Sequence, residues 1–180
     1  GFGGRQVRNP DQPTEIYDHH SVEFHYPNGV LINSQCRQIN GSDNRITEEF
    51  RGTKGIAKIG EITDFKGNVL WKHEARNQAR GGGRRRGDTE NPFQVEHNAL
   101  HAAIRGDQKL NNAYYGATSS FSSVLGRYAT YTGKLWTWDE GMQLAHRGMP
   151  ESVDWQTTPP TLPDKNGQYR LPTPGEYQPA

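Results

Sequence analysis

The chain has 180 residues, of which 31% are hydrophobic and 23% are charged, with a formal net charge of +1 and a mean hydropathy of −0.98. This length suits one compact domain with a tail, and the balanced charge does not favour a nucleic-acid partner. No run of about 18 apolar residues would span a membrane. The 10% of aromatic residues indicate a real core, while the low hydrophobic content fits a domain that buries surface against another body.

Residues 18–39 carry the clearest strand signal, because apolar and polar residues alternate on both sides of a Tyr-Pro-Asn-Gly turn. A two-residue Asn-Gly loop would place Phe24 opposite Asn33 and mix the two faces. A type I turn followed by Gly29 in the left-handed region places Phe24 opposite Ile32 and keeps the apolar face continuous. The proline suits the first central position of that turn, so we predict the second register.

The other face of this hairpin carries a ladder of uncharged and oppositely charged groups. Two interpretations stay open: a solvated sheet face, or a wet subunit interface or cleft wall, since solvated faces usually hold more lysine and glutamate. The predicted pairs are Glu23 with Asn33, Ser21 with Gln35, and His19 with Arg37.

Further strands are expected at 45–51, 55–62 and 68–73, separated by glycine-containing turns. Such a meander predicts a largely antiparallel sheet. Residues 76–90 include a Gly-Gly-Gly-Arg-Arg-Arg-Gly run and have no periodicity, so we predict a mobile loop there.

The first helix is predicted to begin after Asn91, which offers an N-cap, is followed by proline at the first helical position, and has glutamine three residues on. Gly106 ends this helix. Its apolar stripe consists of Phe93, His97, Leu100 and Ile104.

The second helix should run from 113 to 132 and stop at Gly133. Its glycines and serines lower helix propensity, but together with the alanines these small residues let another backbone approach closely. Residues 134–138 are predicted to form a short strand, and Thr137 with Glu140 should cap a last helix.

Seven of the eleven prolines lie in the last 31 residues, so this tail should be ordered only by lying on a surface. The expected fold class is α+β: an open, mainly antiparallel β-sheet with helices on one face and a proline-rich C-terminal tail. Residues 1–148 would form the α/β domain and residues 149–180 the extended tail.

Glycine-rich segments do not indicate a phosphate or nucleic-acid site. The Gly-Phe-Gly-Gly start has Gln6 where the dinucleotide fingerprint needs glycine, and no strand precedes it. The glycine–arginine run has no interleaved aromatic residues, so a solvated loop is favoured over nucleic-acid binding.

Histidine and cysteine positions give no firm site either. His19 and His20 are adjacent in a strand and point to opposite faces, so they do not share one metal ion. His97 and His101 lie at i, i+4, a spacing that can bind metal, but they lack the known zinc-helix motif, so we expect His97 to be a satisfied core or interface histidine. Cys36 is the single cysteine, which excludes an internal disulfide. We expect it to be a small packed residue.

Eight motifs follow one another along the chain. They are Gly3-Gly4-Arg5-Gln6-Val7-Arg8, Tyr17-Asp18-His19, Tyr26-Pro27-Asn28-Gly29, Ser34-Gln35-Cys36-Arg37-Gln38-Ile39, Gly52-Thr53-Lys54-Gly55, Asn91-Pro92-Phe93-Gln94-Val95-Glu96-His97, Leu125-Gly126-Arg127-Tyr128-Ala129-Thr130-Tyr131-Thr132-Gly133-Lys134 and Thr137-Trp138-Asp139-Glu140. In this order they resemble the C-terminal domain of a bacterial branch of the glucose–fructose oxidoreductase and inositol dehydrogenase (Gfo/Idh/MocA) family, over essentially the whole chain.

The resemblance implies a Rossmann domain upstream, followed by this α/β domain, whose sheet builds the subunit interface and roofs the active site. The family's catalytic lysine lies in a Glu-Lys-Pro motif of the Rossmann half, and its Asp-x-x-x-His pair lies near the start of the substrate half. Neither motif occurs in this chain. The chain would therefore hold no catalytic, cofactor-binding or metal residue, and NAD or NADP would bind the parent protein.

The resulting hypothesis is the substrate-binding and oligomerisation half of an NAD(P)-dependent oxidoreductase acting on a sugar, polyol or sugar derivative. It implies a homo-oligomer, at least a dimer, through the sheet face, contact of the Rossmann domain with helix 113–132, a carbohydrate-like ligand, and neither nucleic acid nor membrane. The predicted substrate-binding residues are Arg5, Gln6, Tyr17, His19 and Arg37. The alternative is a non-catalytic binding or oligomerisation module that keeps the sheet and has lost the chemistry.

Overall fold

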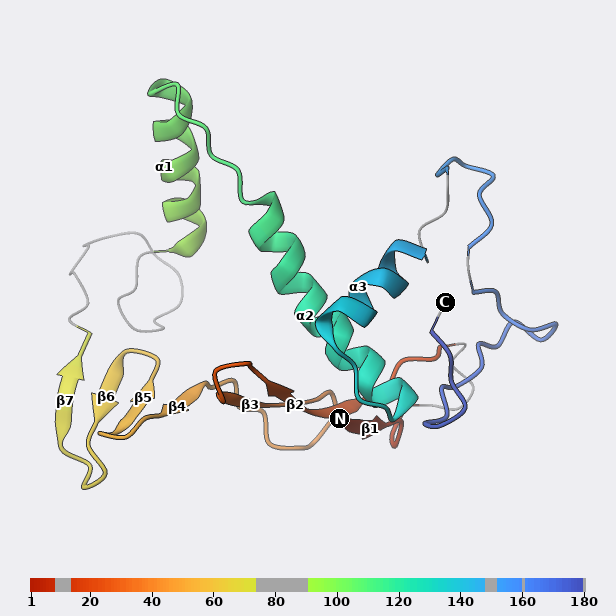
Figure 1. Ribbon diagram of the computed structural model, residues 1–180, viewed down its shortest axis with the longest axis horizontal. Coiled ribbons are helices and arrows are strands. Elements are labelled where there is room, and N and C mark those ends of the chain that lie inside the picture. Colours follow the sequence, from red (N-terminus) through yellow and green to blue (C-terminus); the bar gives the residue numbers. More distant parts are fainter. Residues whose placement is uncertain (9–13, 74–90, 148–151, 160, 180) are drawn as a thin grey trace. The chain divides into compact units, whose positions relative to one another are not determined.

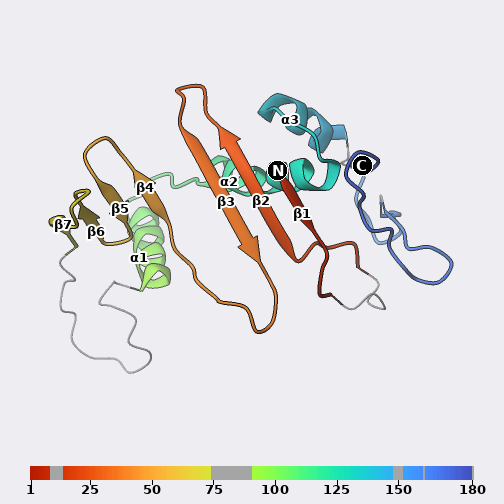
Figure 2. The ribbon, with the colours of Figure 1, turned by 90° about the horizontal axis from the view of Figure 1, so that it is seen from below.

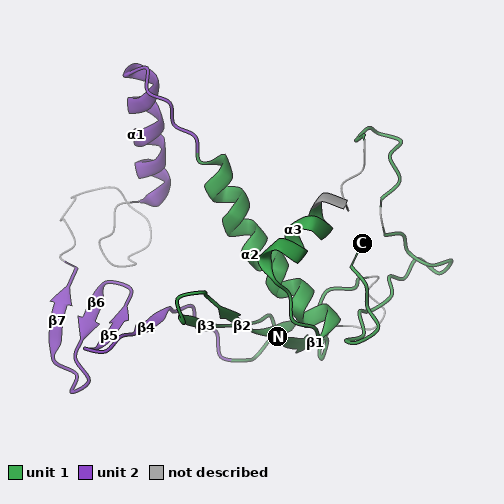
Figure 3. Ribbon diagram, in the orientation of Figure 1, with its two compact units in different colours: residues 1–42, 112–180 green, residues 43–111 purple. Residues whose placement is uncertain are grey.

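The structure, a computed structural model, describes residues 1–8, 14–73, 91–147, 152–159 and 161–179 (Figure 1). It divides the chain into two compact units, which we call unit 1 (residues 1–42 and 112–180) and unit 2 (residues 43–111) (Figure 3). Within these described ranges, two open antiparallel sheets and three helices confirm the α+β class, with two sheets where one was predicted. The loop predicted at 76–90 lies outside the described residues.

Unit 1 contains a three-stranded sheet with the order β1 (Phe2–Gly4), β2 (His19–His25) and β3 (Leu31–Arg37) (Figure 2). Both pairings are antiparallel. The predicted hairpin register is confirmed: Phe24 lies opposite Ile32, and Gly29 has a φ of 83°. A three-residue loop therefore keeps the apolar side chains of β2 and β3 on one face.

Helix α2 (Ala113–Thr132) lies against β1 and β2, and its bounds agree with the predicted ones. Gly126 explains the close approach, since a Cβ there would come within 3.2 Å of the Phe24 ring. Gly133, at a φ of 68°, ends the helix in the left-handed region that glycine favours. The buried apolar side chains of this layer are Tyr17, Val22, Phe121, Leu125, Ala129 and Tyr131.

Helix α3 (Trp138–Arg147) follows directly, so the strand predicted at 134–138 was wrong. The indole of Trp136 donates to the Thr132 hydroxyl at 2.8 Å, which folds the chain back onto the end of α2 instead of extending it. The predicted cap is confirmed, because the Glu140 carboxylate accepts from the Thr137 backbone N–H and the Thr137 hydroxyl accepts from the Glu140 N–H.

The proline-rich tail packs on the rest of unit 1 through residues 172–177. The Gly175 N–H donates to the Thr132 carbonyl at 2.8 Å, and the ring of Tyr177 packs edge-on against Tyr131. The carbonyl of Pro172 accepts a hydrogen bond from the Tyr17 hydroxyl. These contacts attach the end of the chain to the start of the hairpin.

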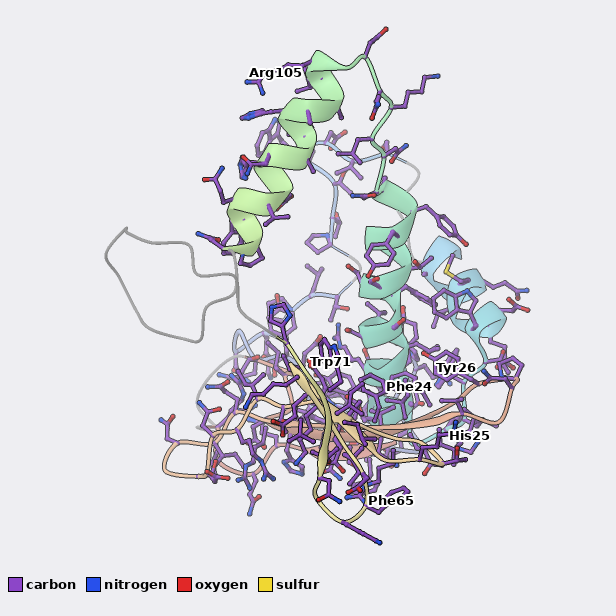
Figure 4. All side chains as sticks on the ribbon, turned by 90° about the vertical axis from the view of Figure 1, so that its left-hand side faces the viewer. Phe24, His25, Tyr26, Phe65, Trp71 and Arg105 are labelled. Carbon is purple, nitrogen blue, oxygen red and sulfur yellow. The ribbon has the colours of Figure 1, made fainter. Side chains whose placement is uncertain are left out.

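Unit 2 holds a meander of four short antiparallel strands in sequence order: β4 (Glu49–Arg51), β5 (Ile56–Lys58), β6 (Glu61–Thr63) and β7 (Val69–Lys72). The single strand predicted at 55–62 was wrong, because Gly60, at a φ of 81°, turns the chain so that Lys58 pairs with Glu61. Phe65 lies at the tip of the next turn (Figure 4).

Helix α1 (Pro92–Arg105) completes unit 2 and begins as predicted, with the Asn91 side chain accepting from the Phe93 N–H at 3.0 Å. The Gln94 amide donates to Asn98 rather than back to the cap. Ala103 is its one buried residue. His97 is exposed, so of the two expected positions, core or interface, the core position was wrong.

Candidate functional site

Asp18, which directly precedes β2, forms hydrogen bonds with several groups in the region where substrate-binding residues were predicted. Its side chain is completely buried. One carboxylate oxygen accepts the backbone N–H groups of Gln6 and Val7, at 2.7 and 2.8 Å, and of Arg8 at 3.3 Å. The other oxygen accepts from the Nδ1 of His19 at 2.8 Å. Asp18 therefore orders the loop that follows β1.

These hydrogen bonds keep the Asp18 side chain ionised. Burial alone would raise the pKa of this carboxyl, but hydrogen bonds from the Val7 N–H, the His19 ring and the Gln6 and Arg8 N–H groups outweigh it and hold the pKa far below its usual range. Asp18 is thus a buried carboxylate whose charge is balanced by donors.

His19 is oriented by this carboxylate. An ionised carboxylate only accepts, so the Nδ1 of His19 carries the proton of this hydrogen bond. Gly4 lies opposite His19 in the sheet, where a Cβ would come within 3.3 Å of the ring. On the other side, Arg37 is its cross-strand neighbour and is exposed.

The other predicted residues have structural contacts. An Arg5 guanidinium nitrogen donates to the Thr14 carbonyl at 2.7 Å. Tyr17 is only 4% exposed, and its hydroxyl donates to Pro172 at 2.7 Å. Burial, with Tyr131 beside it, raises the pKa of Tyr17. The structure thus brings Gln6, His19 and Tyr17 close to Asp18.

Unit 1 also contains a cavity of about 710 Å³, between the apolar face of β2 and β3 and the small residues of α2. Its size falls within the range of small-molecule sites. In Figure 4, Phe24 and Tyr26 lie on the side of β2 that faces α2, and His25 lies on the opposite side. Its lining includes Phe24, Ile32, Ser34, Ser122, Ser123 and His20.

His20 supplies the cavity with a neutral hydrogen-bond acceptor. The Thr130 hydroxyl donates its single proton to the Arg127 carbonyl at 3.0 Å, so it must accept from the Nδ1 of His20, also at 3.0 Å. The lone pair of His20 therefore lies on Nε2. Burial lowers the pKa of His20, and the nearby charges of His19 and Arg127 lower it further.

The charged groups at the cavity are paired. The Arg127 guanidinium bonds to the Glu15 carboxylate at 2.9 Å and lies 4.8 Å from the centre of the Tyr131 ring. Since His20 is neutral and Arg127 and Glu15 offset each other, the cavity suits an uncharged ligand with hydroxyl groups and an apolar side.

None of the five predicted residues lines this cavity, so the sequence analysis missed it. The available signals were the hairpin register and the serines and glycine of helix 113–132, which no motif connects. Cys36 also lines the cavity, opposite His20, and is exposed rather than packed as expected.

Within the described residues, no three histidine, cysteine, aspartate or glutamate side chains gather as a metal-binding group, and no helix is long and apolar enough to cross a membrane. No family model, curated protein or solved structure matches the chain.

Proposed function

We propose that this chain is the substrate-binding and oligomerisation half of an NAD(P)-dependent oxidoreductase that acts on a sugar, polyol or sugar derivative. Two lines support the proposal: the ordered series of motifs that resembles the Gfo/Idh/MocA family, and an α+β fold with open antiparallel sheets. The proton-transfer and hydride groups would belong to the part of the parent that lies upstream of this chain.

The observation that carries the proposal is the cavity between β2, β3 and α2. A sugar has apolar C–H surfaces and a rim of hydroxyl groups. The C–H surfaces would pack on Phe24 and Ile32, as apolar walls in ligand sites do. The hydroxyls would pair with Ser122, Ser123 and the Nε2 of His20, so that each buried polar group finds a partner. The paired charges of the cavity match a neutral ligand.

The N-terminal glycines of this chain do not fit the nicotinamide cofactor. A dinucleotide needs a glycine-rich loop leading into a helix N-terminus. Here Gly3 and Gly4 belong to β1 and pair with β2, and a Cβ on Gly3 would come within 2.5 Å of the His19 carbonyl. These glycines serve close strand packing, so cofactor binding is assigned to the missing half.

The sheet of unit 1 is the proposed subunit interface. All seven residues of β3 are exposed, including those of its polar face. That face carries both donors and acceptors, so it could meet its own copy across a twofold axis. Helix α2 would contact the Rossmann half.

The test uses the complete reading frame that encodes this chain. We expect a glycine fingerprint and a Glu-Lys-Pro motif upstream of Gly1, and NAD(P) reduction with at least one member of a sugar and polyol panel. Ser123→Leu should fill the cavity and raise KM about tenfold or more, since it removes hydroxyl pairing and space. Ser119→Leu, an exposed serine of α2 outside the cavity lining, is the matched control.

Two results would contradict the proposal. An upstream sequence without either motif would favour the alternative, a non-catalytic binding or oligomerisation module. Equal effects of the two leucine substitutions would exclude the cavity as the substrate site while leaving the enzyme class standing.

A further inference from the structure

Two histidines lie one turn apart on α1, His97 and His101. Both are exposed, and their ring centres are 6.4 Å apart in an edge-on arrangement. Residues four apart on a helix are neighbours on its surface. The two imidazoles therefore lie side by side at the surface of unit 2.

The helix itself determines which nitrogen of the neutral His97 ring carries the proton. Its Nδ1 lies 2.7 Å from the Phe93 carbonyl oxygen. A carbonyl only accepts, so Nδ1 carries the proton and the lone pair lies on Nε2, away from the helix backbone. Histidines that bind metals characteristically donate their second ring N–H to a carbonyl or carboxylate in this way.

The distance between the rings is compatible with one shared ion. A metal about 2.0–2.1 Å from each Nε2 lies about 3.2 Å from each ring centre, so rings 6.4 Å apart are at the outer limit of a shared ion. Side-chain rotation that brings the two ring centres about 1 Å closer together makes the Nε2–metal–Nε2 angle tetrahedral. Exposed side chains change rotamer freely on the nanosecond scale.

We propose that His97 and His101 form a two-histidine chelate for a divalent transition metal on α1. Imidazole nitrogen favours Cu²⁺, Ni²⁺ and Zn²⁺, with Cu²⁺ the tightest, whereas Mg²⁺ and Ca²⁺ prefer oxygen. Two protein ligands leave the remaining coordination positions to water or to another molecule. The site does not depend on the proposed oxidoreductase function.

The test is a calorimetric titration of the untagged 180-residue chain with CuSO₄, NiCl₂, ZnSO₄ and MgCl₂. We expect one Cu²⁺ per chain, weaker Ni²⁺ and Zn²⁺ binding, and no Mg²⁺ binding. His97→Gln and His101→Gln should each weaken Cu²⁺ binding about tenfold or more, since a single imidazole replaces a chelate. Circular dichroism should show unchanged helix content.

The sharpest control keeps the number of histidines and breaks the spacing. The double variant His101→Gln/Ala102→His places the second imidazole five positions from His97, on a different side of the helix. It should bind Cu²⁺ as weakly as His101→Gln alone. Wild-type affinity in this relocated variant, or in both single variants, would overturn the proposal and assign the binding to other histidines.

Discussion

The hydroxyl of Tyr17 donates a 2.7 Å hydrogen bond to the carbonyl of Pro172, joining two residues 155 positions apart. Tyr17→Phe should cost about 1–2 kcal/mol of unfolding free energy, because it leaves the buried carbonyl without a partner. Urea unfolding measures the loss. Tyr114→Phe, at a tyrosine that is 82% exposed, is the control and should change stability by less than about 0.5 kcal/mol. Equal losses would mean that the bond does not stabilise unit 1.

Asp18→Asn should destabilise unit 1 more strongly, by about 2–4 kcal/mol, because an uncharged amide replaces a buried carboxylate that accepts four donors. Urea unfolding at neutral pH checks the value. A loss within experimental error would show that the loop after β1 is held by other contacts.

Because of the lowered pKa of Asp18, we expect the free energy of unfolding to fall at acid pH. Its pKa is held far below its usual range in the folded chain, while the unfolded pKa is about 3.9. The stabilisation is therefore complete above about pH 5 and is lost as the pH falls below about 4. The stability difference between wild type and Asp18→Asn should narrow over that range. A difference that stays constant down to pH 2 would contradict this prediction.

Gly141→Ala should weaken the packing of α3 on α2. A Cβ at position 141 would come within 2.6 Å of the Leu125 side chain and 2.9 Å of the Phe121 ring, so the expected cost is about 1–3 kcal/mol. Gly116→Ala is the matched control, because nothing lies within 4 Å of a Cβ there. It should stabilise α2 by about 0.5–1 kcal/mol. Thermal unfolding should move in opposite directions for the two variants.

We expect two copies of the chain to associate through the polar face of β2 and β3. Light scattering at micromolar concentration should give about twice the 20.3 kDa of one chain. Gln35→Lys, on the polar face, should shift the mass toward the monomer by placing like charges together. Ser34→Lys, the neighbouring residue on the cavity face, should leave the mass unchanged. A monomer in every case would mean that the polar face is solvated.

Calorimetry with NAD⁺ and NADP⁺ should detect no saturable binding to this chain. The reason is that its N-terminal glycines pair within the sheet and do not precede a helix. A dissociation constant in the micromolar range for either cofactor would contradict the assignment of cofactor binding to another domain.

Local features were predicted well from the sequence. The proline turn set the register that pairs Phe24 with Ile32, and Gly133 marked the end of α2, because both act through the φ angles of a few adjacent residues. The prediction of one strand at 55–62 failed for a related reason: it ran through Gly60, whose positive φ makes it a turn.

The site could not be predicted in the same way. Asp18 acts through backbone groups ten to twelve positions earlier, and the orientation of His20 depends on Thr130, 110 positions later. No sequence period records such contacts. The cavity lies where a hairpin and a distant helix meet, so it exists only after the chain has folded.

The insertion of unit 2 within unit 1 affects how the protein folds as it is made. Residues 1–42 leave the ribosome before their partners in α2 and the tail, which follow only after residues 43–111. At about 5–20 residues per second, Pro172 is synthesised about 8–30 s after Tyr17. Unit 2 has its strand partners close in sequence and can form during that interval. The nascent hairpin would meanwhile expose Val22 and Phe24, so chaperone binding to the growing chain is expected at this stage.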